Sequence, residues 1–221
     1  MVERMMKRCF CVFVGVLLIS CFLAGCSGKG EDPKEDSGTS ERLAKRYIDL
    51  FSNESYFIKY RAEYEEFVDE NSKDTLTENY EVAVQGEKLS IRITGEDLDG
   101  TMLIVDGKKH MLNHKEKVDQ ISAPEEGDRW MFPSGGYEFK ESGTSELFGV
   151  SYMYEEYMTD SGNFRFFFGD QKLVGIEAVA EDENQNPESI KMEILEWSMK
   201  VPIGVFDIPE GYEVKEEEKK E

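Results

Sequence analysis

The sequence predicts a β-rich α+β domain, in which an N-terminal helix and a connecting helix or loop pack on one curled antiparallel sheet of about nine to ten strands. Two observations predict this class. Apolar residues recur at a spacing of two through most of the chain, which is typical of strands with one buried and one wet face. A sheet of about ten strands rarely stays flat, so we expect it to curl into a half-barrel.

One segment near the N-terminus has helical periodicity instead. Ser40 can cap a helix that runs to about Ser52, because its hydroxyl can accept a hydrogen bond from a backbone N–H of the first turn. We expect this short amphipathic helix to cover the sheet with one apolar face. That face consists of Leu43, Ala44, Tyr47, Ile48, Leu50 and Phe51.

Alternating runs predict the individual strands from residue 56 onward. At 56–65, 80–84 and 89–94 apolar side chains alternate with polar ones, which is typical of half-buried antiparallel strands. The fully apolar run Met102-Leu103-Ile104-Val105 is instead typical of a central strand. The clearest of the nine to ten predicted strands lie at about 56–65, 80–84, 89–94, 102–105, 147–158, 164–169, 172–180 and 190–197.

Turn signals separate these runs. Gly86 ends one strand, and the dipeptides Asp99-Gly100 and Asp106-Gly107 are typical of hairpin turns. Residues 122–136 are rich in proline and glycine and predict a long irregular connection. Loops of more than about 12 residues are often functional. The candidate residues in this connection, which could form a lid, are Trp130, Met131 and Phe132.

The first 25 residues predict a secretory signal. Three basic residues precede an apolar and small-residue segment of about 15 residues, which is too short to span a membrane as a helix. The segment ends in Leu23-Ala24-Gly25-Cys26, which resembles the lipobox of bacterial lipoproteins. That resemblance implies that Cys26 is acylated, with palmitate or a similar chain, and anchors the protein to the cell membrane, facing the cell surface or the periplasm. The alternative is an ordinary cleaved signal or an uncleaved anchor.

Composition divides the chain into four parts and excludes some functions. Residues 1–25 are the signal, 26–39 a lipidated flexible tether, 40–214 the β-rich domain and 215–221 a charged tail. All four cysteines lie at or before residue 26, so the domain has neither a disulfide nor a thiol nucleophile. A net charge of −21 argues against nucleic acid as a partner, because phosphate binding needs clustered Lys and Arg. No motif predicts an oligomeric state.

No catalytic, metal or cofactor site is predicted. His110 and His114 would share one face of a strand, with Glu116 as a third possible ligand, but exposed strand histidines are the simpler interpretation. Residues 143–147 lack the closing glycine of a nucleophile elbow. Glu155 and Glu156 are adjacent in a predicted strand, so their side chains point to opposite faces and cannot act as a glycosidase pair.

Aromatic residues are the remaining candidates. The chain has fourteen Phe and ten Tyr, with dense runs at 152–157 and 164–168 in the second half of the predicted sheet. They either form a thick core beneath the helix or line an apolar cavity that would suit lipid tails. The candidates for a cavity lining in this region are Tyr152, Tyr154, Phe166 and Phe168.

The order of three motifs resembles the LolA-like superfamily of lipoprotein carriers and related bacterial lipoproteins. The motifs are a strand with an Arg at 89–93 followed by a strand ending in Asp-Gly-Lys at 102–108, a late hairpin at 165–176, and a Phe-x-x-Pro-x-Gly ending at 206–211. This resemblance implies a half-barrel closed by helices around an apolar cavity that holds acyl chains, with Arg92 in the position of the family's gating Arg. The family's Arg-Pro step is missing, and the carriers are soluble whereas this chain looks lipidated.

Two functions follow from these observations. The first is a non-catalytic, lipid-anchored protein that binds a hydrophobic or amphipathic ligand, either a lipid or an acyl chain, in the half-barrel. The second is a surface protein-interaction or envelope-sensing module whose core is filled by its own side chains.

Overall fold

The computed structural model describes residues 42–51, 55–69, 72–96, 98–125, 128, 135–160, 162–181 and 187–216. Within these ranges the chain forms one helix, α2 (Leu43–Phe51), and one sheet. The strands of the first half are β1 (Ser55–Asp69), β2 (Ser72–Gln85), β3 (Lys88–Thr94), β4 (Asp99–Val105), β5 (Lys108–Asn113) and β6 (Val118–Ser122). Those of the second half are β7 (Glu138–Leu147), β8 (Val150–Thr159), β9 (Gly162–Gly169), β10 (Lys172–Glu181), β11 (Pro187–Ser198) and β12 (Glu213–Glu216).

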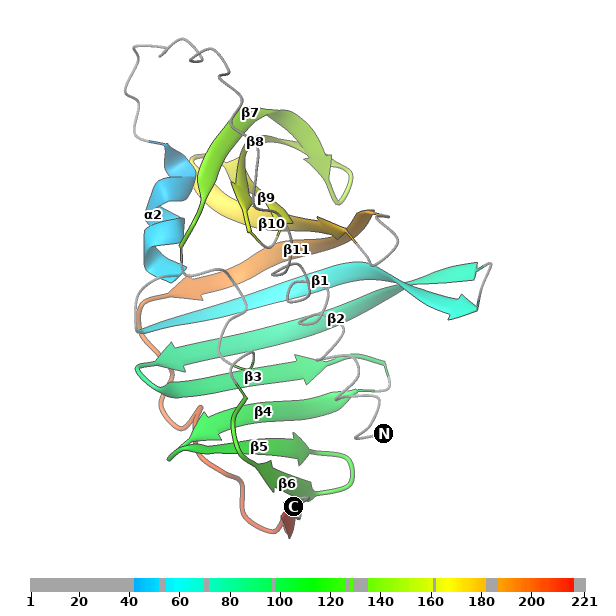
Figure 1. The fold of residues 1–221 in the computed structure, drawn as a ribbon, viewed down its shortest axis with the longest axis vertical. Helices are drawn as coiled ribbons and strands as arrows, with labels where there is room; N and C mark the ends of the chain where they lie inside the picture. The colour runs from blue at the N-terminus through cyan, green and yellow to red at the C-terminus, as the bar shows by residue number, and fades with distance from the viewer. Residues whose placement is uncertain are drawn as a thin grey trace, which may run out of the picture.

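The predicted fold class is confirmed. The twelve strands follow the order β12-β6-β5-β4-β3-β2-β1-β11-β10-β9-β8-β7, so the sheet is open and its two ends are not paired. Every pair is antiparallel except β12 with β6. Figure 1 shows β1–β6 stacked along the long axis, while β7–β10 curl strongly beside α2.

The strand count exceeds the prediction because β6, β7 and β12 lack a clear apolar alternation. Two of them, β7 and β12, form the edges of the sheet, and nearly all of their residues are exposed. An edge strand has less apolar surface to bury, so a hydrophobic pattern does not reveal it. Lys215 and Glu216, which composition assigned to the charged tail, belong to β12.

One prediction about a turn is wrong and another is confirmed. Asp106 and Gly107 form the β4–β5 turn with φ angles of 52° and 74°, as expected for this dipeptide. Asp99 and Gly100 instead begin β4, and the turn lies earlier, where the N–H of Gly95 donates to the carbonyl of Leu98 at 2.8 Å. Leu98 is 5% exposed, so its burial accompanies this shift of the turn toward the N-terminus.

Strand register sorts the side chains into two faces. We call the face on which α2 packs the concave face. A row of directly paired apolar residues crosses it through five strands, each no more than 5% exposed: Ile58, Val82, Ile91, Met102 and Met111. On the other half of the sheet, a second row of directly paired apolar residues lies in the same core: Met192, Ile176 and Phe166. The main core therefore lies on the concave face.

Helix α2 is held in place by groups far away in sequence. The N–H groups of Leu43 and Ala44 donate to the two carboxylate oxygens of Glu155 on β8, each at 3.0 Å. These are first-turn donors with no partner inside the helix. The hydroxyl of Tyr47 accepts from the N–H of Leu173 on β10 at 3.1 Å. Glu155 thus takes the capping role that the sequence assigned to Ser40, which lies outside the described residues.

The opposite face is crossed by the C-terminal segment, residues 199–212, which runs from β11 to β12 (Figure 1). The ammonium of Lys88 lies 5.9 Å from the ring centroid of Phe206, and the N–H of Glu213 donates to the carbonyl of Lys117 at 2.8 Å. This segment therefore reaches across the first half of the sheet to its far edge.

Candidate functional site

The register between β8 and β9 separates the four aromatic residues that the sequence proposed as a cavity lining. Phe166 and Phe168 lie on the concave face and are at most 4% exposed. Met153 is paired with Phe168, and Tyr154 with Phe167, so Tyr152 and Tyr154 point to the opposite face. There the hydroxyl of Tyr154 donates to Glu141 at 2.8 Å. The structure therefore brings Phe166 and Phe168 together and places Tyr152 and Tyr154 apart from them.

Arg92 also lies on the opposite face. It is paired with Thr101 on β4, one residue away from the concave row, and its side chain is 49% exposed. Its guanidinium lies 3.5 Å from the carboxylate of Asp99. The remaining candidates, Trp130, Met131, Phe132 and the lipidation residue Cys26, lie outside the described residues.

An aromatic cluster surrounds the C-terminal end of α2 on the concave face. Phe51 meets Trp197 edge-on at a centroid distance of 5.3 Å, and Tyr56 stacks on the same indole at 5.7 Å. Phe166 contacts both Phe51 and Tyr157, at 6.5 and 5.7 Å. Aromatic pairs in such geometries contribute stability beyond their buried area.

Tyr137 completes this cluster and was missed in the sequence. Its ring lies 5.7 Å from Phe164 and 6.0 Å from Phe166, in both cases edge-on. It precedes β7 and directly follows the irregular connection, where the sequence shows neither helical nor strand periodicity. Tyr56 and Trp197 were visible in alternating runs, but their meeting depends on the pairing of Ile58 with Trp197 across β1 and β11.

The phenols of this cluster are neutral over the physiological range. Burial raises the pKa of Tyr56 to about 12. Burial also raises the pKa of Tyr137, with a further contribution from Tyr56. Tyr157 has a raised pKa because of burial and of the nearby Glu155, to which its hydroxyl donates at 3.0 Å. The concave face thus offers hydroxyl donors in an apolar setting, which suits an uncharged polar group attached to an apolar body.

A charged network occupies the other face of β8. Glu156 is 2% exposed and accepts hydrogen bonds from Lys140 and from Arg165, each at 2.6 Å. Burial alone would raise the pKa of Glu156, but the hydrogen bonds and charges of Lys140 and Arg165 outweigh it and lower the pKa. As the alternation of side chains along a strand predicts, Glu155 and Glu156 point to opposite faces of the sheet.

The two histidines share one face, as predicted, and it is the face opposite α2. The expectation that both are exposed strand residues is wrong, because His110 is 5% exposed and His114 is half-buried in the turn after β5. The Nδ1 of His110 lies 2.9 Å from the buried carboxylate of Asp119. The ring of His114 lies between two hydroxyls, 2.7 Å from Thr101 and 2.5 Å from Tyr212. In the described part of the chain, no group of three His, Cys, Asp or Glu residues is placed to hold a metal ion.

His114 makes stability depend on pH. Burial lowers its pKa, an effect that Asp99 opposes and Arg92 reinforces. Because the folded pKa lies below the unfolded value of about 6.5, the contribution of His114 is fully present above that unfolded value and is lost as the pH falls from it through the lower, folded pKa. We expect the His114→Gln variant to show a flatter decline in unfolding free energy than the wild type between about pH 7 and 5, measured by urea denaturation. Parallel curves would contradict this assignment.

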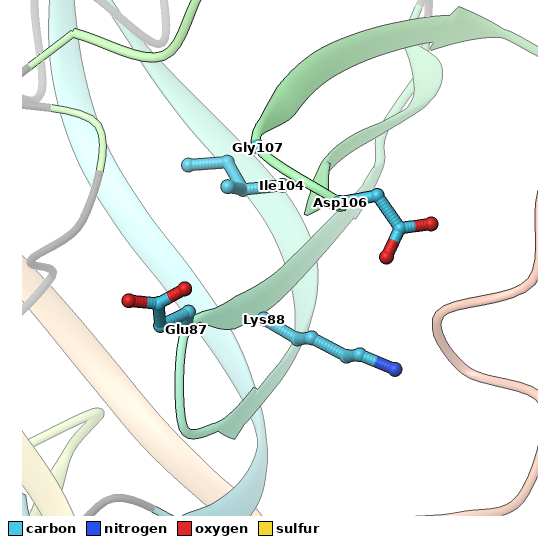
Figure 2. A pocket seen from close by; sticks show the side chains of 5 residues that line it. All are labelled: Glu87, Lys88, Ile104, Asp106 and Gly107. Carbon is cyan, nitrogen blue, oxygen red and sulfur yellow. The ribbon is translucent and has the colours of Figure 1, made fainter.

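A separate hollow of about 200 Å³ lies between the β2–β3 and β4–β5 turns. Figure 2 shows its lining, with Ile104 as the single large apolar side chain: Glu87, Lys88, Ile104, Asp106 and Gly107. Three of its five lining residues are charged, and it lies at the hairpin ends, apart from the aromatic cluster. No described helix is long and apolar enough to cross a membrane.

No family model and no curated protein matches the chain. Solved structures that are similar to it include an uncharacterized conserved protein from Thermus thermophilus, with 8% identity and a TM-score of 0.45 over 80% of this chain and 100% of that one. A LolA superfamily protein from Nitrosomonas europaea has 11% identity and a TM-score of 0.37, over 74% of this chain and 97% of that one. A DUF1329 family protein from Desulfovibrio piger has 8% identity and a TM-score of 0.33, over 75% of this chain and 94% of that one. All three TM-scores lie below 0.5, so the fold assignment rests on this chain's own sheet.

Proposed function

We propose that this protein is a lipid-anchored, extracytoplasmic binding protein without catalytic activity, and that it holds a hydrophobic or amphipathic ligand, a lipid or acyl chain, against the concave face of its half-barrel. The observation that supports this most directly is the apolar row across β1–β5, with the aromatic cluster beside it. Five neighbouring strands span about 19 Å at the usual strand spacing, a length comparable with that of an extended acyl chain.

The open sheet supports the same function. The edges β7 and β12 are not paired with each other, so a change in curvature could separate α2 from part of the concave face without breaking a strand ladder. Met102 and Met111 stand in the middle of the row, and methionine side chains adapt readily to apolar partners of different shape.

One observation favours the second candidate, an interaction or envelope-sensing module. The residues of the row are 0–5% exposed, as expected for a core filled by the protein's own side chains. In that case the function would lie on exposed surfaces such as β7.

Native mass spectrometry of the mature polypeptide, residues 26–221 purified from cells, decides between the two candidates when it is combined with lipid extraction of the same sample. Co-purifying mass of lipid size would support the ligand-binding function. A clean apo mass, with no uptake of added fatty acid or lipopeptide, would overturn it. Met102→Gln should reduce lipid carry-over because it puts an amide into the apolar row, whereas Met158→Gln, at an exposed position outside that row, should not.

The membrane anchor is tested separately. We expect Cys26→Ala to move the protein from the membrane fraction to the soluble fraction, because two or more acyl chains are needed for stable anchoring and this residue would carry them. Fractionation followed by immunoblotting measures the change, with Ser27→Ala as the matched control. A Cys26→Ala protein that stays in the membrane fraction would show that the lipobox interpretation is wrong.

A further inference from the structure

The Tyr137 hydroxyl is a buried polar group with no hydrogen-bond partner among the described residues. Buried hydroxyls are normally hydrogen-bonded, and one that is not costs the protein free energy. Its ring is fixed edge-on against Tyr157, Phe164 and Phe166, so the hydroxyl cannot turn freely toward water.

The position of this hydroxyl is informative. Phe164 and Phe166 belong to β9, yet the pKa of Tyr137 is also affected by Tyr56 on β1. In the sheet, β10 and β11 lie between β9 and β1. Tyr137 therefore packs on the concave face against β9, and Tyr56 on β1 is near enough to influence its pKa.

We propose that Tyr137 is the specificity residue of the concave face and that its hydroxyl donates a hydrogen bond to the neutral carbonyl oxygen of an acyl ester or amide. This inference rests on the proposed ligand-binding function and specifies the chemical class of the ligand. Burial keeps the phenols of Tyr137 and of the neighbouring Tyr56 in the protonated form, which can donate a hydrogen bond. A carboxylate here would lose its hydration in exchange for neutral donors only, whereas a neutral carbonyl needs just one such donor.

Two probes that differ only in the carbonyl test this assignment. They are 1-monopalmitoylglycerol, which carries an ester, and 1-O-hexadecylglycerol, its ether counterpart. We expect the mature wild-type polypeptide to bind the ester roughly tenfold more tightly than the ether, the size of effect that one buried hydrogen bond provides. Tyr137→Phe should bind both with the affinity that the wild type has for the ether. Tyr154→Phe, on the opposite face, should behave as the wild type.

Each outcome separates this inference from the function on which it rests. Equal wild-type affinities for the two probes would overturn the role of Tyr137 and leave lipid binding intact. Failure of the wild type to bind either probe would overturn the proposed function, and this inference with it. The melting temperature of Tyr137→Phe without ligand should equal or exceed that of the wild type, because the variant removes an unpaired group. A marked decrease would mean that the hydroxyl has a partner inside the protein.

Discussion

Replacing Phe166 with alanine is expected to lower the free energy of unfolding by about 4 kcal/mol. The ring is 0% exposed and contacts Phe51, Tyr137 and Tyr157. Its removal would leave a cavity where α2, β8 and β9 meet, which the paired strands cannot collapse to fill. Urea denaturation at pH 7 measures the loss.

Tyr154→Ala is the matched control for Phe166→Ala. It also removes an aromatic ring, from the neighbouring strand, but on the opposite face, where the Tyr154 hydroxyl is bonded to Glu141. We expect a clearly smaller loss. Equal losses in the two variants would contradict the assignment of the core to the concave face.

Replacing Arg165 with methionine is expected to cost about 2 kcal/mol at pH 7. Arg165 donates to the carboxylate of Glu156, which is itself 2% exposed, and methionine keeps the length of the side chain without the charge. The buried carboxylate would then depend on Lys140 alone. Chemical denaturation of the wild type and the variant at several pH values gives the difference.

The pH dependence identifies the cause of that loss. Interactions with Lys140 and Arg165 lower the pKa of Glu156, so the stability that it provides is present above the unfolded value of about 4.3 and is lost as the pH falls from there through the lower, folded pKa. The difference between wild type and Arg165→Met should therefore shrink below about pH 4. Arg61→Met is the control, because both partners of the Arg61–Glu193 pair are about 40% exposed, and such pairs contribute at most about 1 kcal/mol. A difference that is the same at every pH would indicate lost packing and not the ion pair.

Much of the fold could be predicted because its signals are local. The alternation in β1 and β3 marks these strands directly, and Asp106-Gly107 encodes its own turn. The same kind of dipeptide at Asp99-Gly100 did not form a turn, since the burial of Leu98 and the pairing of Thr94 with Asp99 place that position inside a ladder. A local preference holds only where no tertiary contact opposes it.

The candidate site was predictable only within single strands. A period of two determines that Phe166 and Phe168 share a face and that Tyr152 and Tyr154 share a face. Whether the two pairs share the same face depends on the register of the β8–β9 hairpin, which pairs Met153 with Phe168. A shift by one residue would have put all four on one side. Tyr137 follows no periodic run, so its place in the aromatic cluster could not be predicted.

The sequence by itself determined the β-rich class, the helix before the sheet and the opposite orientations of Glu155 and Glu156, because each depends only on the spacing of neighbouring residues. The tertiary structure decided what these groups do. It set Glu155 at the first turn of α2, 111 and 112 residues away in the chain, and enclosed Glu156 between Lys140 and Arg165. Such contacts arise only when the sheet curls and sets its registers, and no local pattern in the chain records them.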